Sequence, residues 1–227
     1  MKAKVLSRID ISDDLIKVRL RPEENWKHQG GQYLKLAPSL DYDLKPFSIA
    51  SSPELAPEIE LHIRNTHGST WIEELFIAIK PNSTVEIEGP FDHLNGRLPL
   101  EENTVILLAG GTGYAPMKSL LDELLANKNI EHVNLYWGAT SSSELYEHDE
   151  LTNLQSEHPK FHYHGCVSGS STESNWEGFT GFVHEKVLED FHDLANTEVL
   201  ACGPKEMTEA AKQSFFEKGL KEASFIS

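Results

Sequence analysis

Val105-Ile106-Leu107-Leu108-Ala109-Gly110-Gly111-Thr112-Gly113-Tyr114-Ala115-Pro116 joins an apolar run to a cluster of glycines. The apolar run lacks in/out alternation and is too short to cross a membrane, so it indicates a buried strand of a parallel sheet. Apolar residues then recur at helical spacing from Met117 to Leu125, and Pro116 suits the first helical turn, where its missing N–H is not needed. The segment therefore predicts a strand, a glycine turn and a helix.

The glycine turn has two interpretations. Gly110, Gly111 and Gly113 allow a tight turn with close backbone approach, and a following helix N-terminus favours a phosphate-bearing ligand. The dinucleotide fingerprint G-x-G-x-x-G, with an acid about 20 residues later, is incomplete because Pro116 takes the last glycine's place. A turn made for packing alone therefore remains the alternative.

Composition excludes several partner classes. The chain has 227 residues, is 39% hydrophobic and carries a net charge of −16. That charge argues against nucleic acid and anionic membranes, and an anionic cofactor needs local cations or oriented amides. The first residues lack the apolar core of a signal peptide. Two cysteines, Cys166 and Cys202, fit a reducing cytoplasm without a disulfide framework.

The first hundred residues predict a small antiparallel β-barrel. Short alternating runs bounded by Pro, Gly and Asp indicate strands at Leu15–Leu20, Gln32–Leu36, Ile59–Arg64 and Val85–Glu88. One helical pattern, Trp71–Ile79, interrupts them and is expected to cover the open end of the barrel.

From Thr104 onward, apolar strands alternate with amphipathic helices, which predicts a doubly wound parallel sheet. The expected strands are Val105–Ala109, Val133–Trp137, Phe161–Val167 and Thr197–Ala201, with helices from Ala115, near Phe182–Phe191, and around Met207–Phe215. The boundary is placed near Leu98, which gives domains 1–98 and 99–227. Loops at Gly110, Gly138, Ser168 and Cys202 should gather at the carboxyl edge of the sheet, and Ser168–Gly178 is expected to be mobile.

Three further segments are candidates for chemistry. Ala201–Met207 repeats the strand, glycine and helix pattern, with Lys205 near the positive end of a helix. Lys45-Pro46-Phe47-Ser48 combines a cation, a rigid proline, an aromatic ring and a hydroxyl; its alternative is a plain strand edge. Gly68-Ser69-Thr70 precedes a helix. Ser69 or Thr70 is either the N-cap of that helix or part of a second anion site.

Together, these segments and Tyr136-Trp137-Gly138 resemble, in order, the ferredoxin–NADP reductase-like superfamily, and most of all its bacterial NAD(P)H:flavin oxidoreductases. The resemblance covers nearly the whole chain. It implies a flavin (FAD or FMN, as prosthetic group or substrate) on the barrel, and NADH or NADPH on the α/β domain. It also implies that regions around Ser48 and Cys202 share one cleft, where a hydride passes directly from nicotinamide C4 to flavin N5.

The resemblance assigns residues as follows. Ser48 and Cys202 are the catalytic positions. The flavin would contact Lys45, Pro46, Phe47, Ser48, His62, Ile63, Gly68, Ser69 and Thr70, and the nicotinamide nucleotide would contact Gly110, Gly111, Thr112, Gly113, Ala115, Pro116, Cys202, Gly203, Pro204 and Met207. No metal is expected.

The sequence departs from the family pattern at positions that bear on flavin binding and on nicotinamide preference. Lys45 stands where the family usually has arginine, so a flavin phosphate would meet a point charge and not a bidentate fork. The loop Ala139–Ser143 lacks an arginine for a 2′-phosphate, which favours NADH. Relatives commonly continue past Ser227 into a tail with a terminal aromatic residue.

Two other features receive structural interpretations. His162, His164 and Cys166 share a strand face at a spacing that metals tolerate, but a packed or solvated face is favoured. The acidic run Glu144–Glu150 is expected to form a solvated helix face.

The sequence thus favours a cytoplasmic flavin reductase that passes reduced flavin to an acceptor, such as a flavin-dependent oxygenase. Two cysteines cannot supply the roughly four thiolates of an iron–sulfur cluster. One alternative is a reductase subunit with tightly bound FAD that feeds an oxygenase or iron–sulfur partner. The other is a non-catalytic nucleotide-sensing module.

Overall fold

The computed structural model describes residues 1–65, 68–92, 100, 102–169 and 176–227. The chain divides into two compact units, Met1–Gly96 with Lys118–Leu121, and Arg97–Met117 with Asp122–Ser227. The predicted boundary at Leu98 lies outside the described residues, as do residues 170–175 of the predicted loop Ser168–Gly178.

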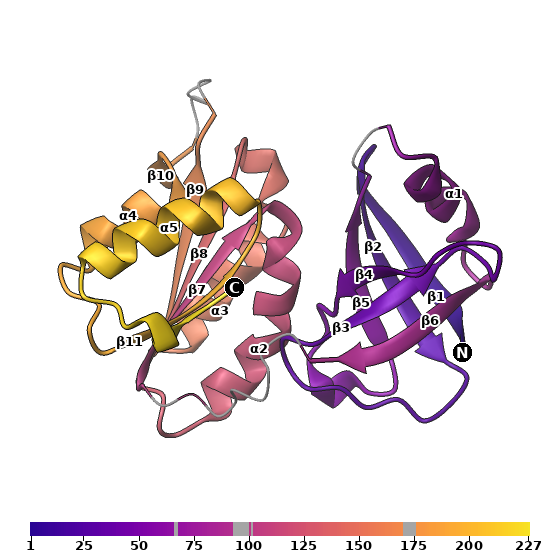
Figure 1. The fold of residues 1–227 in the computed structure, drawn as a ribbon, viewed down its shortest axis with the longest axis horizontal. Coiled ribbons are helices and arrows are strands. Elements are labelled where there is room, and N and C mark those ends of the chain that lie inside the picture. Colours follow the sequence, from indigo (N-terminus) through magenta and orange to yellow (C-terminus); the bar gives the residue numbers. More distant parts are fainter. Residues whose placement is uncertain (66–67, 93–99, 101, 170–175) are drawn as a thin grey trace. The chain divides into compact units, whose positions relative to one another are not determined.

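The first unit is an antiparallel barrel (Figure 1). Its six strands pair in the order β4-β3-β6-β1-β2-β5 and comprise β1 (Lys2–Ser12), β2 (Leu15–Pro22), β3 (Tyr33–Ala37), β4 (Lys45–Ser48), β5 (Ile59–Arg64) and β6 (Thr84–Phe91). A bridge between Ile49 and Leu61 links the two ends of this order and closes the sheet. The predicted barrel is confirmed.

The barrel core forms from the inward side chains of alternating strands. Val18, Leu20 and Leu61 are fully buried there. Helix α1 (Thr70–Ala78) contributes Ile72 and Leu75 to the same core. The helical pattern in the sequence is therefore confirmed as an amphipathic element packed on the barrel.

Strand β1 has no counterpart among the sequence-based predictions. Ala3 and Val5 point inward, but the register with β2 shifts between Val5 and Ser7 and again between Asp10 and Ser12. Each bulge breaks the period-two pattern by which a strand is recognised. Ile9 consequently lies 53% exposed, and the alternation disappears from the sequence.

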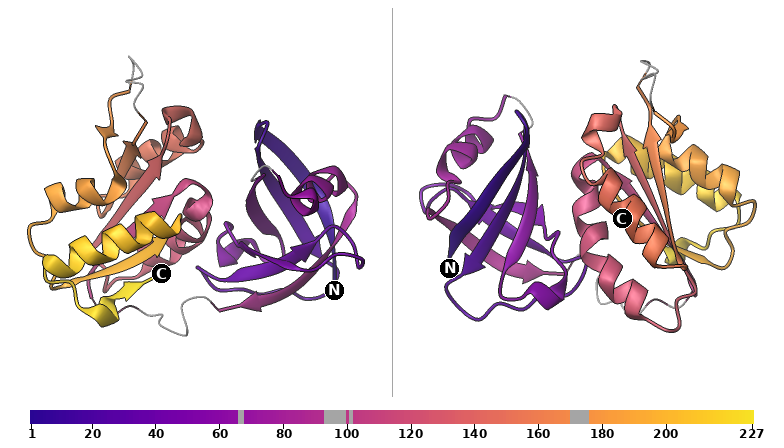
Figure 2. Two further views of the ribbon diagram at one scale, coloured as in Figure 1. Left: turned by 45° about the horizontal axis from the view of Figure 1, so that its top comes forward. Right: turned by 180° about the vertical axis from the view of Figure 1, so that it is seen from behind.

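The second unit is a parallel sheet with helices on both faces (Figure 2). Its strand order is β10-β9-β8-β7-β11-β12, with β7 (Thr104–Gly110), β8 (His132–Ala139), β9 (Phe161–Val167), β10 (Phe179–Thr180), β11 (Thr197–Cys202) and β12 (Phe225–Ile226). The helices are α2 (Tyr114–Ala126), α3 (His148–Glu157), α4 (Val183–Asp190) and α5 (Lys205–Glu217). Val187 and Phe215, from α4 and α5, pack in one core cluster with Ile106 and Leu108.

Strand order reverses direction beside β7. After β7 the chain adds β8 and β9 on one side, and later returns to place β11 on the other side. Ala109 pairs with both Trp137 and Cys202 across this point. Open α/β sheets bind ligands outside the carboxyl ends of their strands at such a switch point. The predicted doubly wound sheet is confirmed, and it brings the strand-end loops at Gly110, Gly138 and Cys202 together.

Lys160 fixes the far end of α2. Its Nζ donates hydrogen bonds to the carbonyl oxygens of Leu124, Asn127 and Ile130 at 2.9, 2.8 and 3.2 Å. The final carbonyls of a helix have no partner within the helix, and a cation there also complements the helix dipole. Burial lowers the pKa of this ammonium. The helix that follows the glycine turn is thus anchored at its other end.

Candidate cofactor-binding sites

Two strand-end loops meet closely at the switch point. A β-carbon on Gly113 would lie 2.1 Å from the Cys202 carbonyl oxygen, and one on Gly110 would lie 2.6 Å from Met207 Sδ. Gly203 adopts a φ of +159°, and a β-carbon there would lie 2.7 Å from Met207 Cε. A side chain at Gly113 would meet backbone atoms and would therefore separate the loops, whereas one at Gly110 or Gly203 would first displace the Met207 side chain. The sequence-based prediction that both loops lie together is confirmed.

The glycine turn is held in a defined conformation. Gly111 has a φ of +53°, which favours glycine, and residues 111–113 form a single 3-10 turn before α2. The Gly111 carbonyl accepts hydrogen bonds from the Tyr114 backbone N–H and, at 2.9 Å, from the Trp137 indole. This carbonyl is thereby directed toward the indole, and the start of α2 keeps the positive dipole end that suits a phosphate.

An aromatic cluster supports this turn. The Tyr114 and Trp137 rings stack with centroids 4.0 Å apart, and Tyr146 packs its edge on Trp137 at 5.0 Å. The Tyr114 hydroxyl donates to Glu147 Oε2 at 2.8 Å. Burial, together with the Glu147 charge, raises the pKa of Tyr114, so the phenol stays protonated.

The acidic run Glu144–Glu150 was expected on a solvated helix face, and this prediction is wrong. Residues 142–144 form a separate 3-10 turn, and α3 begins only at His148. Glu147 is only 4% exposed, and its carboxylate accepts a hydrogen bond from the Tyr114 hydroxyl. A buried acid with a distant partner carries no local signal in the sequence.

Cys202 ends β11 beside the glycine turn. Burial raises the pKa of its thiol, so the sulfur is neutral at pH 7. A neutral thiol is a weak nucleophile and suits packing or weak hydrogen bonding better than covalent chemistry. Lys205 and Met207 start α5 directly afterwards, and Lys205 pairs with Glu209 at 3.5 Å.

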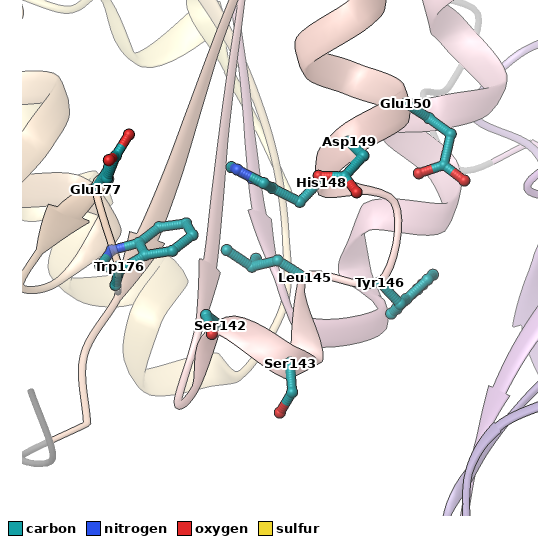
Figure 3. A pocket seen from close by; sticks show the side chains of 10 residues that line it. Ser142, Ser143, Leu145, Tyr146, His148, Asp149, Glu150, Trp176 and Glu177 are labelled. Carbon is teal, nitrogen blue, oxygen red and sulfur yellow. The ribbon is translucent and has the colours of Figure 1, made fainter. Parts of the chain in front are cut away.

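A pocket of about 420 Å³ opens beside the turn that follows β8 (Figure 3). Ser142, Ser143 and Tyr146 line it, and Tyr146 also contacts Trp137 of the aromatic cluster. Among the described residues, its lining includes carboxylates but no lysine or arginine; the carboxylates belong to Asp149, Glu150 and Glu177. The pocket therefore has an unfavourable charge for an additional phosphate.

In the barrel, the Lys45–Ser48 segment forms strand β4. Pro46 pairs with Lys35, and Ser48 pairs with Tyr33. The strand-edge interpretation of this segment is thus correct as far as the backbone goes. Lys45 and Pro46 are exposed, whereas Phe47 and Ser48 are half-buried. Because consecutive side chains of a strand point to opposite faces, Phe47 packs toward the barrel core and Trp71, and the Ser48 hydroxyl lies on the other face.

Trp71 of α1 connects this strand to the helix start. The Lys45 ammonium lies 4.5 Å from the centroid of the Trp71 ring, and the Phe47 and Trp71 rings stack with their centroids 6.1 Å apart. The Trp71 indole N–H donates to the Asp43 carbonyl at 2.9 Å. Trp71 thus contacts three positions of the segment that leads into and forms β4.

Gly68, Ser69 and Thr70, which the sequence analysis assigns to the flavin, lie at the start of α1. Gly68 has a φ of +96°, and Ser69 occupies the N-cap position. The Ser69 side chain makes no capping hydrogen bond, so the interpretation of this hydroxyl as a helix cap is not supported. Thr70 begins the helix.

His62 and Ile63 follow one another on β5 but have different surroundings. The Ile63 side chain is fully buried in the core, so only its backbone can contact a ligand. The His62 side chain is also fully buried and lies on the opposite face, where its Nε2 donates to Glu60 Oε1 at 3.1 Å.

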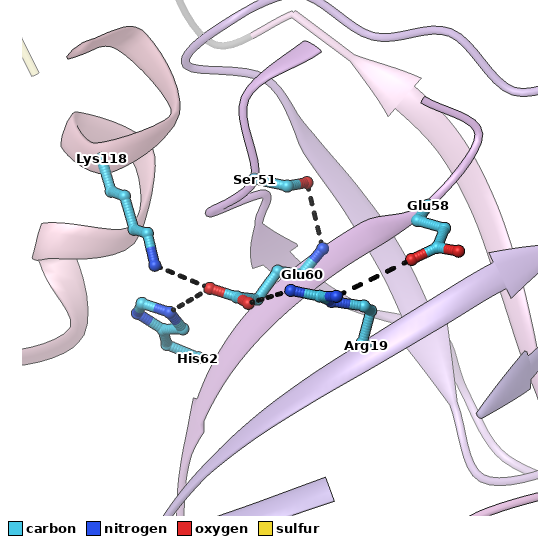
Figure 4. A network of polar contacts seen from close by, with 6 residues as sticks. All are labelled: Arg19, Ser51, Glu58, Glu60, His62 and Lys118. Carbon is cyan, nitrogen blue, oxygen red and sulfur yellow. Dashed lines mark hydrogen bonds and ion pairs between the residues drawn. The ribbon is translucent and has the colours of Figure 1, made fainter. Parts of the chain in front are cut away.

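Glu60 is the centre of a polar network (Figure 4). Its carboxylate accepts a hydrogen bond from Nζ of Lys118 at 2.8 Å, and Lys118 belongs to the same unit. Arg19 forms an ion pair with the same carboxylate at 3.7 Å. Burial alone would raise the pKa of Glu60, but the His62 hydrogen bond and the Lys118 charge outweigh it and lower the pKa well below its usual range. Glu60 therefore remains ionised beside His62 throughout the neutral range.

His162, His164 and Cys166 lie along β9, as the sequence predicts. The His164 ring stacks on Tyr136 with centroids 4.3 Å apart and lies 3.6 Å from Asp190. Burial raises the pKa of the Cys166 thiol to about 12. This face packs against α4, which agrees with its interpretation as a packed strand face.

Sequence reasoning missed the roles of three aromatic residues. Trp71, Tyr114 and Trp137 shape the two loop regions through contacts with residues 26 to 33 positions away. Their presence in the sequence is compatible with simple core packing, so no local pattern distinguishes these roles.

Comparison with known proteins decides the family. Residues 1–95 match the FAD-binding domain, and residues 107–213 match the oxidoreductase NAD-binding domain. The NAD(P)H-flavin reductase of Vibrio harveyi is 32% identical over 221 residues, which cover 95% of this chain and 91% of that protein. The chain belongs to the NAD(P)H-flavin reductase family. This confirms the resemblance to the ferredoxin–NADP reductase-like superfamily.

Some other relatives of this flavin reductase are longer than the chain. A CDP-6-deoxy-L-threo-D-glycero-4-hexulose-3-dehydrase reductase of Yersinia pestis is 35% identical over 215 residues, and the match spans 94% of this chain but 63% of that protein. Among solved structures, the Amycolatopsis cytochrome P450 reductase GcoB aligns with a TM-score of 0.89 at 26% identity, covering all of this chain and 68% of GcoB. No helix in the described part of the chain has the length and apolar character needed to cross a bilayer.

Proposed function

We propose that this protein is an NAD(P)H-dependent flavin reductase, with residues 1–98 binding the flavin and residues 99–227 binding the nicotinamide nucleotide. The observation that carries the proposal is the close meeting of the Gly110–Gly113 and Cys202–Met207 loops at the switch point of the sheet. The flavin reductase relatives, which match along nearly their whole length, support the same activity.

The residues present fit both cofactors. The glycine turn and the start of α2 provide backbone N–H groups and a positive dipole end for a pyrophosphate. Phe47 and Ser48 offer an aromatic contact and a hydroxyl donor on β4 for a flavin ring. When both cofactors are bound, they supply direct hydride transfer from nicotinamide C4 to flavin N5. The chain itself would bind and orient the cofactors: Ser48 would offer its hydroxyl to the flavin ring, and Cys202 would pack beside the nicotinamide.

The charge of the pocket beside β8 supports NADH over NADPH. Its three carboxylates would repel a 2′-phosphate, and its described lining offers no cation to hold one. The reduced flavin would then pass to an acceptor, for which a flavin-dependent oxygenase in the cytoplasm is the proposed partner.

Steady-state oxidation of NADH and NADPH, with riboflavin, FMN and FAD in turn, tests this function. We expect NADH oxidation that depends on added flavin and saturates with it, from protein that is colourless as purified. If neither NADH nor NADPH is oxidised with any of the three flavins, the reductase function is excluded and a nucleotide-binding module remains.

A tightly bound FAD is the second candidate. It is favoured by relatives named phenol hydroxylase P5 protein and phenol 2-monooxygenase reductase component, which are 29% and 28% identical to this chain. Gel filtration separates the two candidates, because a reductase component of this kind keeps stoichiometric FAD in the protein fraction, whereas a free-flavin reductase loses it.

A further inference from the structure

The side chain of Glu147 turns away from the helix that it begins. Glu147 occupies the N-cap position of α3, where an acidic side chain commonly accepts hydrogen bonds from the first N–H groups of its own helix. Within α3 its side chain makes no such bond. The carboxylate is buried instead, and it accepts a hydrogen bond at 2.8 Å from the hydroxyl of Tyr114, 33 residues away in the chain. The Glu147 carboxylate thus serves a connection to α2 and not the cap of α3.

This bond joins two segments that lie at different parts of the proposed nucleotide site. Tyr114 is the first residue of α2 and directly follows the glycine turn. The neighbours of Glu147 on both sides, Tyr146 and His148, line the pocket beside β8 (Figure 3). With the pyrophosphate of the nucleotide at the turn, the adenosine half extends toward this pocket. The Tyr114–Glu147 bond therefore connects the segments that would hold the two halves of one ligand.

Ring contacts alone leave this connection without a fixed direction. Tyr146 packs edge-on against Tyr114 and Trp137, with ring centroids 6.1 and 5.0 Å apart, and the Tyr114 and Trp137 rings stack at 4.0 Å. Stacked and edge-to-face rings tolerate a range of offsets. A hydrogen bond between a hydroxyl and a carboxylate is restricted in length and angle, and an ionised acceptor makes it stronger than a neutral one. The bond to Glu147 supplies the restraint that the rings lack.

We propose that Glu147 is a positioning residue that, through the Tyr114 hydroxyl, sets the spacing between the glycine turn and the pocket beside β8, so that the whole dinucleotide NADH binds in preference to either of its halves. This inference rests on the proposed function, because it deepens the nucleotide site of that function. Two linked groups that bind at once gain a high effective concentration only if their sites lie at the separation that the ligand spans. Each half by itself does not depend on that separation.

The experiment measures dissociation constants by isothermal titration calorimetry, without flavin. The ligands are NADH, reduced nicotinamide mononucleotide and AMP, because the last two contain the two halves of NADH and test the turn and the pocket separately. We expect Glu147→Ala and Tyr114→Phe each to weaken NADH about five- to twentyfold, while both halves stay within about twofold. Glu147→Gln keeps an acceptor oxygen in place and should retain most of the NADH affinity.

A double variant and a charge control complete the design. If the single bond is responsible, Tyr114→Phe/Glu147→Ala should weaken NADH no more than either substitution alone. Glu157→Ala removes an exposed carboxylate at the other end of α3 and should leave all three constants unchanged. Should Glu147→Ala not fold, as judged by circular dichroism, the loss in Tyr114→Phe and its absence in Glu147→Gln decide the question, because both side chains keep their shape.

Several results would overturn the role of Glu147. A mononucleotide that weakens as much as NADH would place the effect in the glycine turn, and AMP that does so would place it in the pocket. Additive losses in the double variant would show that the two residues act separately. Tighter binding of NADH and of the mononucleotide in Glu147→Gln would show that the charge matters and not the spacing.

Failure of the proposed function is recognised separately, in the steady-state assay, when neither nicotinamide is oxidised with any flavin. Flavin-dependent oxidation together with unchanged NADH affinity in Glu147→Ala and Tyr114→Phe leaves the reductase function intact and refutes the spacing role. If the unaltered protein does not bind NADH, both the function and the inference are wrong.

Discussion

Gly113 packs directly against the Cys202 carbonyl, which a β-carbon on Gly113 would approach to 2.1 Å. Backbone groups cannot move aside as a flexible side chain can. We therefore expect Gly113→Ala to push the two loops apart, to lower the free energy of unfolding by about 1–3 kcal/mol, and to raise the KM for NADH. Urea unfolding and steady-state kinetics measure the two effects.

Gly111→Asn is the matched control for that substitution. Nothing lies within 4 Å of a β-carbon at Gly111, and asparagine tolerates its φ of +53°. This variant should lose about 1 kcal/mol or less. Equal losses from both variants would show that the close approach to Cys202 is not what matters.

Cys202 offers a test of the chemical step. Its buried thiol is neutral, because burial raises its pKa, so its proposed contribution is packing beside the nicotinamide. Cys202→Ala should slow hydride transfer by roughly ten- to a hundredfold, since small displacements of reacting groups have effects of that order, while NADH affinity changes little. Stopped-flow reduction of bound flavin gives the rate. A raised NADH dissociation constant with an unchanged transfer rate would contradict this role.

The pocket beside β8 predicts how the nicotinamide preference can be altered. Glu177→Lys places a cation in a lining that otherwise presents carboxylates. We expect the ratio of kcat/KM for NADPH over NADH to rise roughly tenfold, equivalent to about 1.4 kcal/mol of altered charge interaction. Glu157→Lys, at the end of α3 and outside the pocket lining, makes the same change in net charge and should leave the ratio unchanged.

Lys160 should matter for stability and not for catalysis. Lys160→Met removes three hydrogen bonds at the end of α2, and we expect a loss of about 1–3 kcal/mol in the free energy of unfolding. Lys160→Arg retains a donor and a charge and should lose less. If Lys160→Met unfolds at the same urea concentration as the unaltered protein, the anchoring role is wrong.

His28 gives the barrel a pH-dependent stability. Its Nε2 donates to the Ser51 carbonyl at 3.1 Å, and burial lowers its pKa below the ordinary value of 6.5. The unfolded state therefore binds more protons near pH 6, so this contribution to stability is complete above pH 6.5 and is lost as the pH falls toward the lowered pKa. His28→Gln should flatten the decline in unfolding free energy between pH 7 and pH 5. Parallel curves for the two proteins would refute this assignment.

Much of the fold follows from local patterns. Ile59–Arg64 and Phe161–Val167 are strands with the bounds that their composition predicts, and the apolar run before Gly110 is a central strand of the parallel sheet. These segments have regular periods, because one face or both faces are buried along their whole length. The bulged strand Lys2–Ser12 lacks such a period and could not be recognised.

The site could be predicted only in part. Glycine turns are visible in the sequence because few other residues adopt their backbone conformations. The burial of Glu147 and the contacts of Trp71 and Trp137 depend on residues that are distant in the chain, so composition and spacing contain no sign of them. The roles of Ser48 and Cys202 stay predictions, and the stopped-flow measurement on Cys202→Ala tests the second of them.

The indole of Trp137 holds the Gly111 carbonyl while the Tyr114 N–H binds the same oxygen. Because the Gly111 carbonyl oxygen already accepts two hydrogen bonds, its peptide group does not have to rotate before a diphosphate binds at the turn. Nucleotide association should therefore follow simple second-order kinetics, with an observed rate that rises linearly with NADH concentration and shows no plateau from a slow conformational step.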